Sequence, residues 1–380
     1  MRNLLFLFAI PVLALPAFAA AQAQVTPDTQ TIELAQVTAA SAATSTEIAG
    51  TGTQEESQIL TATVLDGAEK GQSVTFENDY TQLKVGDTFY LRHTSNALDG
   101  TDYYTVSDPY RLNILEALAV AFLVLVVVFG GLQGVRGFVS LLGSLVLIFY
   151  VLVPGILGGY PVLWITVGTT ALIIIVGSYI THGFNKTTSA AVLGMLGTVL
   201  VTGALAYWAV HAAQLSGYNS EEDVYLNFNT HGTIDLVALL FGGIMIGLLG
   251  VLYDIAIGQA IAVEELYRAG SHMTRAHVYR RAIRIGREHI GALVNTLAIA
   301  YVGAALPLLL VVSSATYGIA YTINNEIFAT ELVRILIGSI GLVLGVPITT
   351  FIATYTLEHL RGTGGADGLH AHTHSAADDV

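Results

Sequence analysis

The sequence predicts an all-α polytopic membrane protein of about seven transmembrane helices, preceded by a small exported β domain at the N-terminus. Three observations predict this class. Of the 380 residues, 53% are hydrophobic and 11% are charged, whereas soluble globular proteins carry about 25% charged residues. Several apolar runs reach the length of about 18 residues that a membrane-spanning helix needs. Basic residues gather in alternate connections between these runs, as they do in chains inserted with one orientation.

Residues 1–21 have the pattern of a secretory signal peptide. Arg2 precedes an apolar core, and small residues such as Ala19 and Ala21 follow it. This order of basic, apolar and small residues directs export. It predicts cleavage near residues 19–23, with retention as an uncleaved anchor as the alternative, because signal and anchor differ only in degree.

The chain then changes character twice before its first long apolar run. Residues 22–54 are rich in Ala, Thr, Gln and Ser and poor in aromatics, which predicts a flexible tether. Residues 55–109 contain the β-type runs QILTATVLDG, QSVTFEN and DTFYLRHT, separated by glycine-containing turns. We expect a β domain of about five strands here, exported with the signal and able to bind a protein partner on the outer side.

Residues 110–356 are predicted to form the transmembrane domain. The expected spans are 112–130, 138–158, 161–180, 188–211, 233–253, 290–314 and 329–355. The connections 131–137, 181–187 and 254–289 and the tail 357–380 all contain Lys or Arg, whereas the three intervening connections contain none. This asymmetry predicts a β domain on the outer side and a cytoplasmic C-terminus.

Composition and missing motifs exclude several classes of function. The absence of cysteine excludes disulfides, thiolate catalysis and cysteine-ligated metals. Nucleic-acid binding is not expected, because no basic cluster lies on a sizeable soluble region. The chain has no H-E-x-x-H, G-x-S-x-G or Walker motif. Tyr253-Asp254 resembles half of the residue pair of intramembrane aspartyl proteases, but the G-x-G-D half is missing. We expect neither an enzyme nor a bound cofactor.

The fifth expected span places one carboxylate, Asp254, in the apolar run GVLYDIAIGQA. At about 100° per residue it shares a narrow stripe with four glycines, which predicts close packing against another helix. These helix-packing glycines are Gly243, Gly247, Gly250 and Gly258. The apolar run continues to Val263, so residues 234–263 would make a helix about 45 Å long. Such a helix either projects from the hydrocarbon layer, with Asp254 structural at its surface, or breaks and places Asp254 deeper for an ion-linked role.

Other polar residues in or beside the spans complete a candidate polar intramembrane site. Glu265 shares the face of Asp254 but lies about 16 Å along a straight helix. Asn295 either bonds across to a neighbouring helix or lines a substrate path. Glu331 and Arg334 either pair locally, being three residues apart, or Arg334 contacts an anion. The full candidate set is Asp254, Gln259, Glu265, Asn295, Thr296, Glu331 and Arg334.

Two further clusters carry charge or metal-ligating groups. Arg280, Arg284 and Arg287 share one side of a predicted helix, where they would meet anionic headgroups or simply retain the loop in the cytoplasm. An ion pair from one of them to Asp254 or Glu265 fits either interpretation. In the tail, His370, His372 and His374 alternate with small residues, a pattern typical of solvated disorder and of weak metal binding; no structural metal site is expected.

Long segments of the chain resemble the YibE/F-like family of multi-spanning bacterial membrane proteins. The resemblance rests on GLLGVLYDIAIGQAIAVEEL, IGREHIGALVNTLAIAYVGAALPLLL and NNEIFATELVRILIGSIGLVLGVPITT, within residues 110–356, and on EKGQSVTFENDYTQLKVGDTF in the β segment. It implies an integral membrane protein of bacterial type. It implies no activity and assigns no role to any residue.

Two functional hypotheses follow from the residues. The first is a permease or ion-coupled transporter with a polar intramembrane site around Asp254. The alternative is a membrane scaffold or envelope-assembly factor whose exported β domain binds a partner. The bilayer is the expected partner of both.

Overall fold

The computed structural model describes residues 29–361 except 48–49, 51–53, 271 and 315–317. The expected signal peptide and the histidines of the tail lie outside the described residues. The chain divides into two compact units, residues 1–121 and 122–380.

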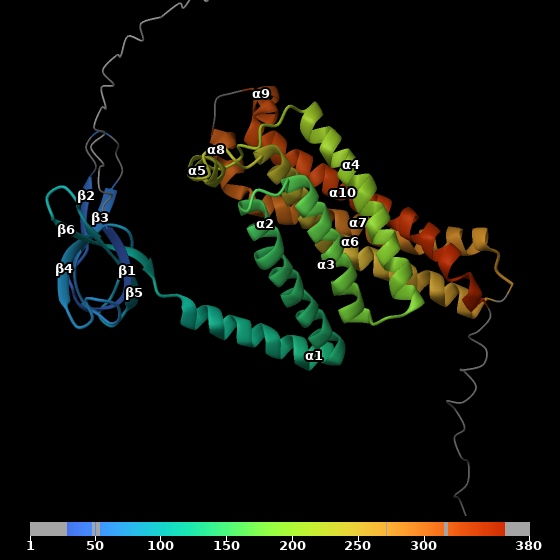
Figure 1. The fold of residues 1–380 in the computed structure, drawn as a ribbon, viewed down its shortest axis with the longest axis horizontal. Coiled ribbons are helices and arrows are strands. Elements are labelled where there is room, and N and C mark those ends of the chain that lie inside the picture. Colours follow the sequence, from blue (N-terminus) through green and yellow to red (C-terminus); the bar gives the residue numbers. More distant parts are fainter. Residues whose placement is uncertain (1–28, 48–49, 51–53, 271, 315–317, 362–380) are drawn as a thin grey trace, which may run out of the picture. The chain divides into compact units, whose positions relative to one another are not determined.

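The first unit is an antiparallel sheet curved into a half-barrel (Figure 1). Its strand order is β2-β3-β1-β5-β6, and β4 also pairs with β3. Alternate side chains of the strands point to one face and form a buried core that includes Ala35, Leu60, Phe89 and Leu91. The strands are β1 (Thr29–Ala40), β2 (Thr44–Glu47), β3 (Gln54–Val64), β4 (Ser73–Asn78), β5 (Thr88–Ser95) and β6 (Asp102–Pro109).

The prediction of a flexible tether over residues 22–54 is wrong for the part that the structure describes. β1 and β2 lie in it, and β1 is the central strand between β3 and β5. Composition misled because β1 is rich in Thr, Gln and Ala, yet Ala35 and Val37 are fully buried. The neighbouring strands of the sheet bury the few apolar side chains that β1 has. The β domain therefore covers residues 29–109 rather than 55–109.

A histidine joins three segments of the β domain. In β5, His93 Nδ1 lies 3.2 Å from Glu69 Oε1 and His93 Nε2 lies 2.9 Å from Asp102 Oδ1. Hydrogen bonding from His93 lowers the pKa of Asp102. The ring of Tyr104 stacks on the imidazole with centroids 4.6 Å apart, so the cluster ties β6 and the β3–β4 turn to β5.

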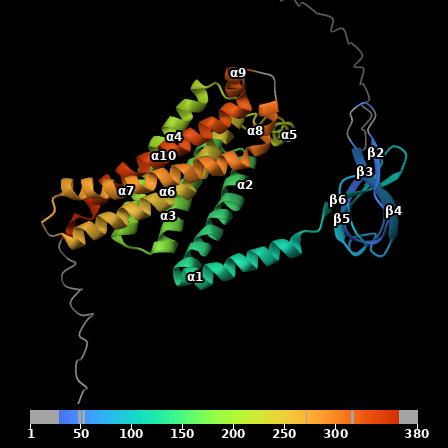
Figure 2. The ribbon, with the colours of Figure 1, turned by 180° about the vertical axis from the view of Figure 1, so that it is seen from behind.

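The second unit is a bundle of helices (Figure 2). Its central helices α4, α6 and α10 pack against one another, with α3 and α7 against α6. The elements after β6 are α1 (Leu112–Leu147), the π-helix Ile148–Leu152, α2 (Val153–Leu157), α3 (Val162–His182), α4 (Lys186–Ala212), α5 (Glu221–Asn229), α6 (Leu236–Ala269), α7 (Arg275–Ala304), α8 (Leu306–Ser314), α9 (Ile319–Asn324), α10 (Glu326–Thr356) and the 3₁₀ turn Glu358–Leu360.

Among the described residues, five helical stretches are long and apolar enough to cross a membrane, and a sixth is the pair α7–α8, which is bent by 66°. The difference from the seven expected spans arises at residues 131–137. That expected loop is helical, so α1 and α2 form one stretch of 46 residues. Gly131 interrupts α1 with φ 52° and ψ −145°. The rings of Phe122 and Phe138 lie 6.2 Å apart, so the chain folds back on itself there.

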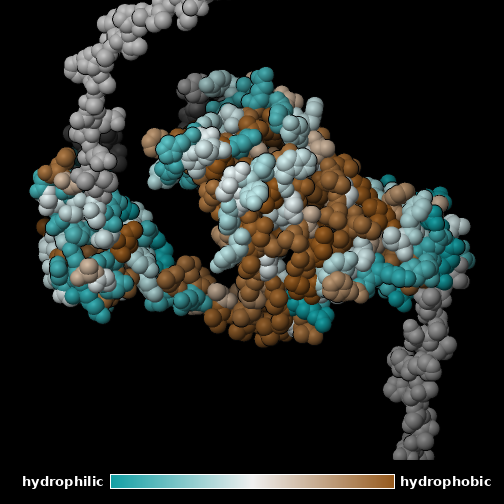
Figure 3. Space-filling model, viewed as in Figure 1, coloured by the Kyte–Doolittle hydropathy of each residue, from teal (hydrophilic) through white to brown (hydrophobic). Residues whose placement is uncertain are grey.

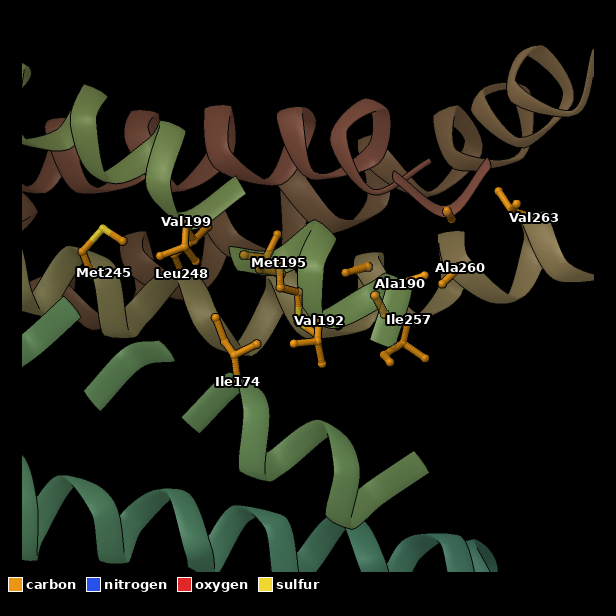
Figure 4. Close-up of a cluster of buried hydrophobic side chains, with 14 of the residues drawn as sticks. Ile174, Ala190, Val192, Met195, Val199, Met245, Leu248, Ile257, Ala260 and Val263 are labelled. Atoms are coloured by element: carbon orange, nitrogen blue, oxygen red, sulfur yellow. The ribbon is translucent and has the colours of Figure 1, made fainter. Parts of the chain in front are cut away.

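The core of the bundle lies between α4 and α6, with Ile174 of α3 against it (Figure 4). Met195 and Val199 of α4 and Met245 and Leu248 of α6 are nearly or fully buried in it. Glycines allow the third central helix to approach closely. A Cβ at Gly341 of α10 would lie 2.8 Å from Thr202 of α4 and 3.0 Å from Leu248 of α6.

The bundle carries an apolar surface between two polar ends (Figure 3). We call one of these the basic end. It is formed by the α3–α4 turn, the last turns of α6 and the residues after α10, and Lys186 Nζ lies 3.1 Å from His359 Nε2 there. At the other, the acidic end, Ser216 donates to Glu326, which starts α10, and acidic residues begin α5. These apolar helices are compatible with a multi-pass membrane protein.

Candidate functional site

Asp254 lies on α6 at the edge of a cavity of about 740 Å³ between α1, α3 and α6. α6 is continuous past Asp254, from Leu236 to Ala269, so it does not break near its glycines. The Asp254 side chain is accessible from the cavity. Most of the cavity lining is apolar. Its apolar side chains are Leu141, Leu145, Ile148, Ile173, Ile174, Ile246, Leu249 and Ile257.

Hydroxyl groups from three helices form the polar part of the lining. Ser140 of α1 donates to the carbonyl of Gly177 on α3 at 3.2 Å, and Thr181 donates to the same carbonyl at 2.9 Å. Tyr253 of α6 also lines the cavity and adds a third hydroxyl group. The cavity therefore has one formal negative charge, Asp254, among hydroxyls and aliphatic side chains.

The titratable neighbour of Asp254 is His182, the last residue of α3, which interacts with it electrostatically and lines the same cavity. Its ring lies 6.0 Å from that of Tyr253. Gly183, with φ 76°, ends the helix directly after His182 in a conformation that favours glycine. Asn185 then caps α4 by accepting a hydrogen bond from the Thr188 backbone N–H at 2.7 Å. This turn fixes His182 at the basic end of the cavity.

A second pocket of about 480 Å³ adjoins this turn, and we call it the Lys186 pocket. It lies at the basic end. Glu264 accepts hydrogen bonds there from Thr187, at 2.5 Å, and from Arg268, at 2.8 and 3.0 Å. The pocket is lined by His182, Asn185, Lys186, Thr187, Thr188, Ile257, Ile261, Glu264, Arg268, His359 and Leu360.

The sequence predicted that the glycine stripe packs closely against another helix, but most of its glycines do not. A Cβ added at Gly243, Gly250 or Gly258 would meet no atom within 4 Å. Gly250 and Gly258 line the Asp254 cavity instead, on either side of the carboxylate. Gly247 is the exception, because a Cβ there would strike the hydroxyl of Tyr301 on α7. Gly243 lies beside Glu331 and Arg334 in a separate pocket.

Gln259 and Glu265 lie outside the Asp254 cavity, although they share its helix. Gln259 is 3% exposed and accepts a hydrogen bond from Thr350 of α10 at 2.8 Å. Five residues rotate it by about 140° from Asp254. Glu265 is exposed near the basic end of α6. The structure therefore separates these two residues from Asp254.

The remaining predicted residues are also apart from Asp254. Asn295 and Thr296 are exposed on α7, and Thr296 donates to the Ala292 carbonyl one turn earlier. Arg334 donates to Glu331 at 2.7 Å, so the expected local pair is present. That pair lines a separate pocket of about 300 Å³ near the acidic end, together with Gly243.

The predicted basic helix is the first half of α7. Arg280, Arg284 and Arg287 are exposed there, and none forms an ion pair with Asp254 or Glu265 in the described part of the chain. Arg280 donates to the carbonyl of Ala276 in its own helix. The lipid contact predicted for these arginines stays a prediction.

Sequence reasoning missed His182, Ser140 and the Lys186 pocket. His182 lies at the end of an apolar span, in the motif H-G-F-N-K. A polar residue there usually marks only the boundary between the span and the next connection. Its distance of 72 positions from Asp254 gave no sign of contact. Across the described residues, no cluster of three or more His, Cys, Asp or Glu side chains has the arrangement of a metal site.

Comparisons with known proteins match both units of the chain. Residues 118–359 match the YibE/F-like protein family, and residues 28–95 match the YibE/F family N-terminal domain. The second match begins just before β1, in agreement with the boundary that the structure gives. No curated protein and no solved structure matches the chain. The first match covers more than half of the chain, and the chain therefore belongs to the YibE/F-like family.

Proposed function

We propose that this protein is an ion-coupled transporter or permease of the bacterial cytoplasmic membrane, and that Asp254 is its ion-binding group. The Asp254 cavity is the observation that supports the proposal most. Its walls are apolar helices, and the Asp254 carboxylate is accessible within it. Because α6 does not break at its glycines, the support comes from this cavity and not from a deeper position of Asp254 in the bilayer. An ionisable group within an apolar span is costly, and such groups usually line an ion or substrate path. The volume lies within the range of about 300–1,000 Å³ that small-molecule sites occupy.

The neighbours of Asp254 favour transport over the alternatives weighed from the sequence. A structural pair at the membrane surface would need an arginine beside Asp254, but in the described residues the titratable groups that interact with it are His182 and Tyr253. Hydrolysis by an aspartyl mechanism would need a second carboxylate at that position. In the proposed orientation the basic end faces the cytoplasm and the β domain is exported, following the distribution of Lys and Arg.

Charge movement in liposomes tests the proposal. The full-length protein would be reconstituted on a solid-supported membrane and exposed to jumps in pH or in sodium concentration. We expect transient currents that Asp254→Asn abolishes, because the amide keeps the shape of the side chain but not its charge. Glu265→Gln is the matched control, since it removes an exposed carboxylate from the same helix and leaves the currents unchanged. Normal currents from the Asp254→Asn variant would refute the proposal.

The β domain supports a second candidate function, a scaffold that binds a partner on the outer side. It forms a compact unit with its own buried core and matches a family domain of its own. An independently folded exported domain is suited to recognition of another protein or of an envelope component.

A further inference from the structure

The Asp254 cavity and the Lys186 pocket share part of their lining. His182 and Ile257 belong to both. These two side chains come from α3 and α6, and they stand where one cavity ends and the other begins. Beyond them the Lys186 pocket reaches the basic end of the bundle, where Lys186 and His359 are exposed.

We propose that the Lys186 pocket is the entrance to the Asp254 cavity, and that His182 is the gate residue that passes protons between the two. This inference rests on the proposed function and names its coupling ion, the proton. The path runs from the basic end through the pocket, past His182, to the carboxylate of Asp254.

Three features place His182 in this role. Gly183 ends α3 directly after it, so the imidazole is held by the turn rather than by a free helix end. On the cavity side, the ring lies 6.0 Å from that of Tyr253 and interacts electrostatically with Asp254. On the pocket side, the titratable or charged groups come from three other elements: Glu264 and Arg268 of α6, Lys186 of α4, and His359 of the turn after α10.

The chemistry of the pair fits a proton better than a metal cation. A proton from the imidazolium of His182 reaches the carboxylate of Asp254 through water in the cavity, and both groups end neutral; the reverse transfer restores the two charges. Histidine and carboxylate pairs are the usual members of proton relays in membrane proteins. Hard cations such as Ca²⁺ take about six or more oxygen ligands, chiefly carboxylates and carbonyls, whereas the side chains that line the Asp254 cavity contribute one carboxylate and a few hydroxyls.

Thiol labelling tests the path without any transport assay. The chain has no cysteine, so each introduced thiol reacts alone. Gly258→Cys places a thiol in the cavity and Thr187→Cys places one in the pocket. A charged, membrane-impermeant methanethiosulfonate reagent would be added to either side of liposomes that contain the full-length protein. We expect both thiols to react from the same side, which is that of the basic end.

A larger side chain at position 182 then distinguishes the cavity thiol from the pocket thiol. In the His182→Trp background, labelling of the Gly258→Cys variant is lost, while labelling of Thr187→Cys continues. His359→Trp is the matched control, because His359 lines the pocket but not the cavity, and it should leave the ratio of the two rates unchanged. Reaction of the cavity thiol from the opposite side, no reaction of it from either side, or the same rate in the His182→Trp background would overturn the path.

A conservative variant tests the proton step and guards against misfolding. His182→Gln keeps the space open, so labelling of the Gly258→Cys variant should persist, which also shows that the cavity is intact. Charge movement after a pH jump should slow by about 10²-fold or more, as expected for loss of a positioned acid–base group. Unchanged pH-jump currents from His182→Gln, or wild-type currents driven by sodium jumps at constant pH, would overturn the proton assignment.

The two failures can be distinguished. If Asp254→Asn keeps normal currents but labelling follows the expected pattern, the proposed function is wrong and the path from the Lys186 pocket stands. If Asp254→Asn abolishes currents but the cavity thiol reacts from the opposite side, the function stands and the path is wrong.

Discussion

At the scale of single residues, the chemistry around Asp254 depends on partners far away in sequence. The sequence identified Asp254 itself, because a carboxylate in an apolar run is conspicuous. It did not identify His182 or Ser140, which line the cavity only when α3 packs against α6 and α1 contacts α3. The candidate set was too wide for the same reason: seven polar residues in apolar spans looked equivalent, and the fold distributes them over at least three places.

Gln259 shows how one of these residues serves stability instead. Thr350 lies buried between Gln259 Oε1 at 2.8 Å and the Val346 carbonyl at 2.7 Å. We expect Thr350→Val to lower the free energy of unfolding by about 1–3 kcal/mol, because it leaves the buried amide oxygen without a donor. Adding Gln259→Met should recover most of that loss, since both partners are then apolar. Thermal unfolding of the two variants in detergent measures this, and an additive second loss would contradict it.

At the scale of elements, apolar periodicity predicted the helices well and their interruptions poorly. The spans expected near 161–180, 188–211 and 329–355 correspond to α3, α4 and α10 within a few residues. The predicted loop 131–137 and the tether 22–54 were the failures. A helix can bend at a single glycine without the polar, turn-forming residues that mark a loop in a sequence. A strand with few large apolar residues is stabilised by its neighbours in the sheet.

Glycines on neighbouring helices should differ sharply in their tolerance of larger side chains. At Gly341 a new side chain would collide with Thr202 and Leu248, so Gly341→Val should destabilise the bundle by about 1–3 kcal/mol through overpacking. Gly250 faces open space, so Gly250→Val should unfold at the wild-type temperature. It should nonetheless reduce pH-jump currents, because the valine side chain intrudes beside Asp254. Equal thermal stability of the two variants would show that the helix packing is misassigned.

At the scale of the whole molecule, the chain consists of two units with separate cores, each matching its own family domain. The β unit should therefore fold without the helices. We expect residues 28–110, expressed alone, to give a cooperative unfolding transition and a β-type circular dichroism spectrum. A broad, non-cooperative transition would contradict this.

Removal of the same unit tests the scaffold role. A chain that keeps residues 1–27 but lacks residues 28–109 should still give pH-jump currents in liposomes if the helices alone carry transport. In cells, a scaffold role predicts that this deletion is as damaging as Asp254→Asn even though the currents persist. Full activity of the deleted form in cells would rule out the scaffold.

The break at Gly131 has a consequence for how the protein is made. A stretch of 46 residues at 1.5 Å per residue would be about 69 Å long, more than twice the thickness of the hydrocarbon layer. Folding back at Gly131 gives two segments that can leave the translocon together as a helical hairpin. Any residue with a Cβ would strain the backbone there. In the membrane protein that we propose, this one position therefore decides whether the chain offers one overlong apolar helix or a pair of shorter helices for insertion.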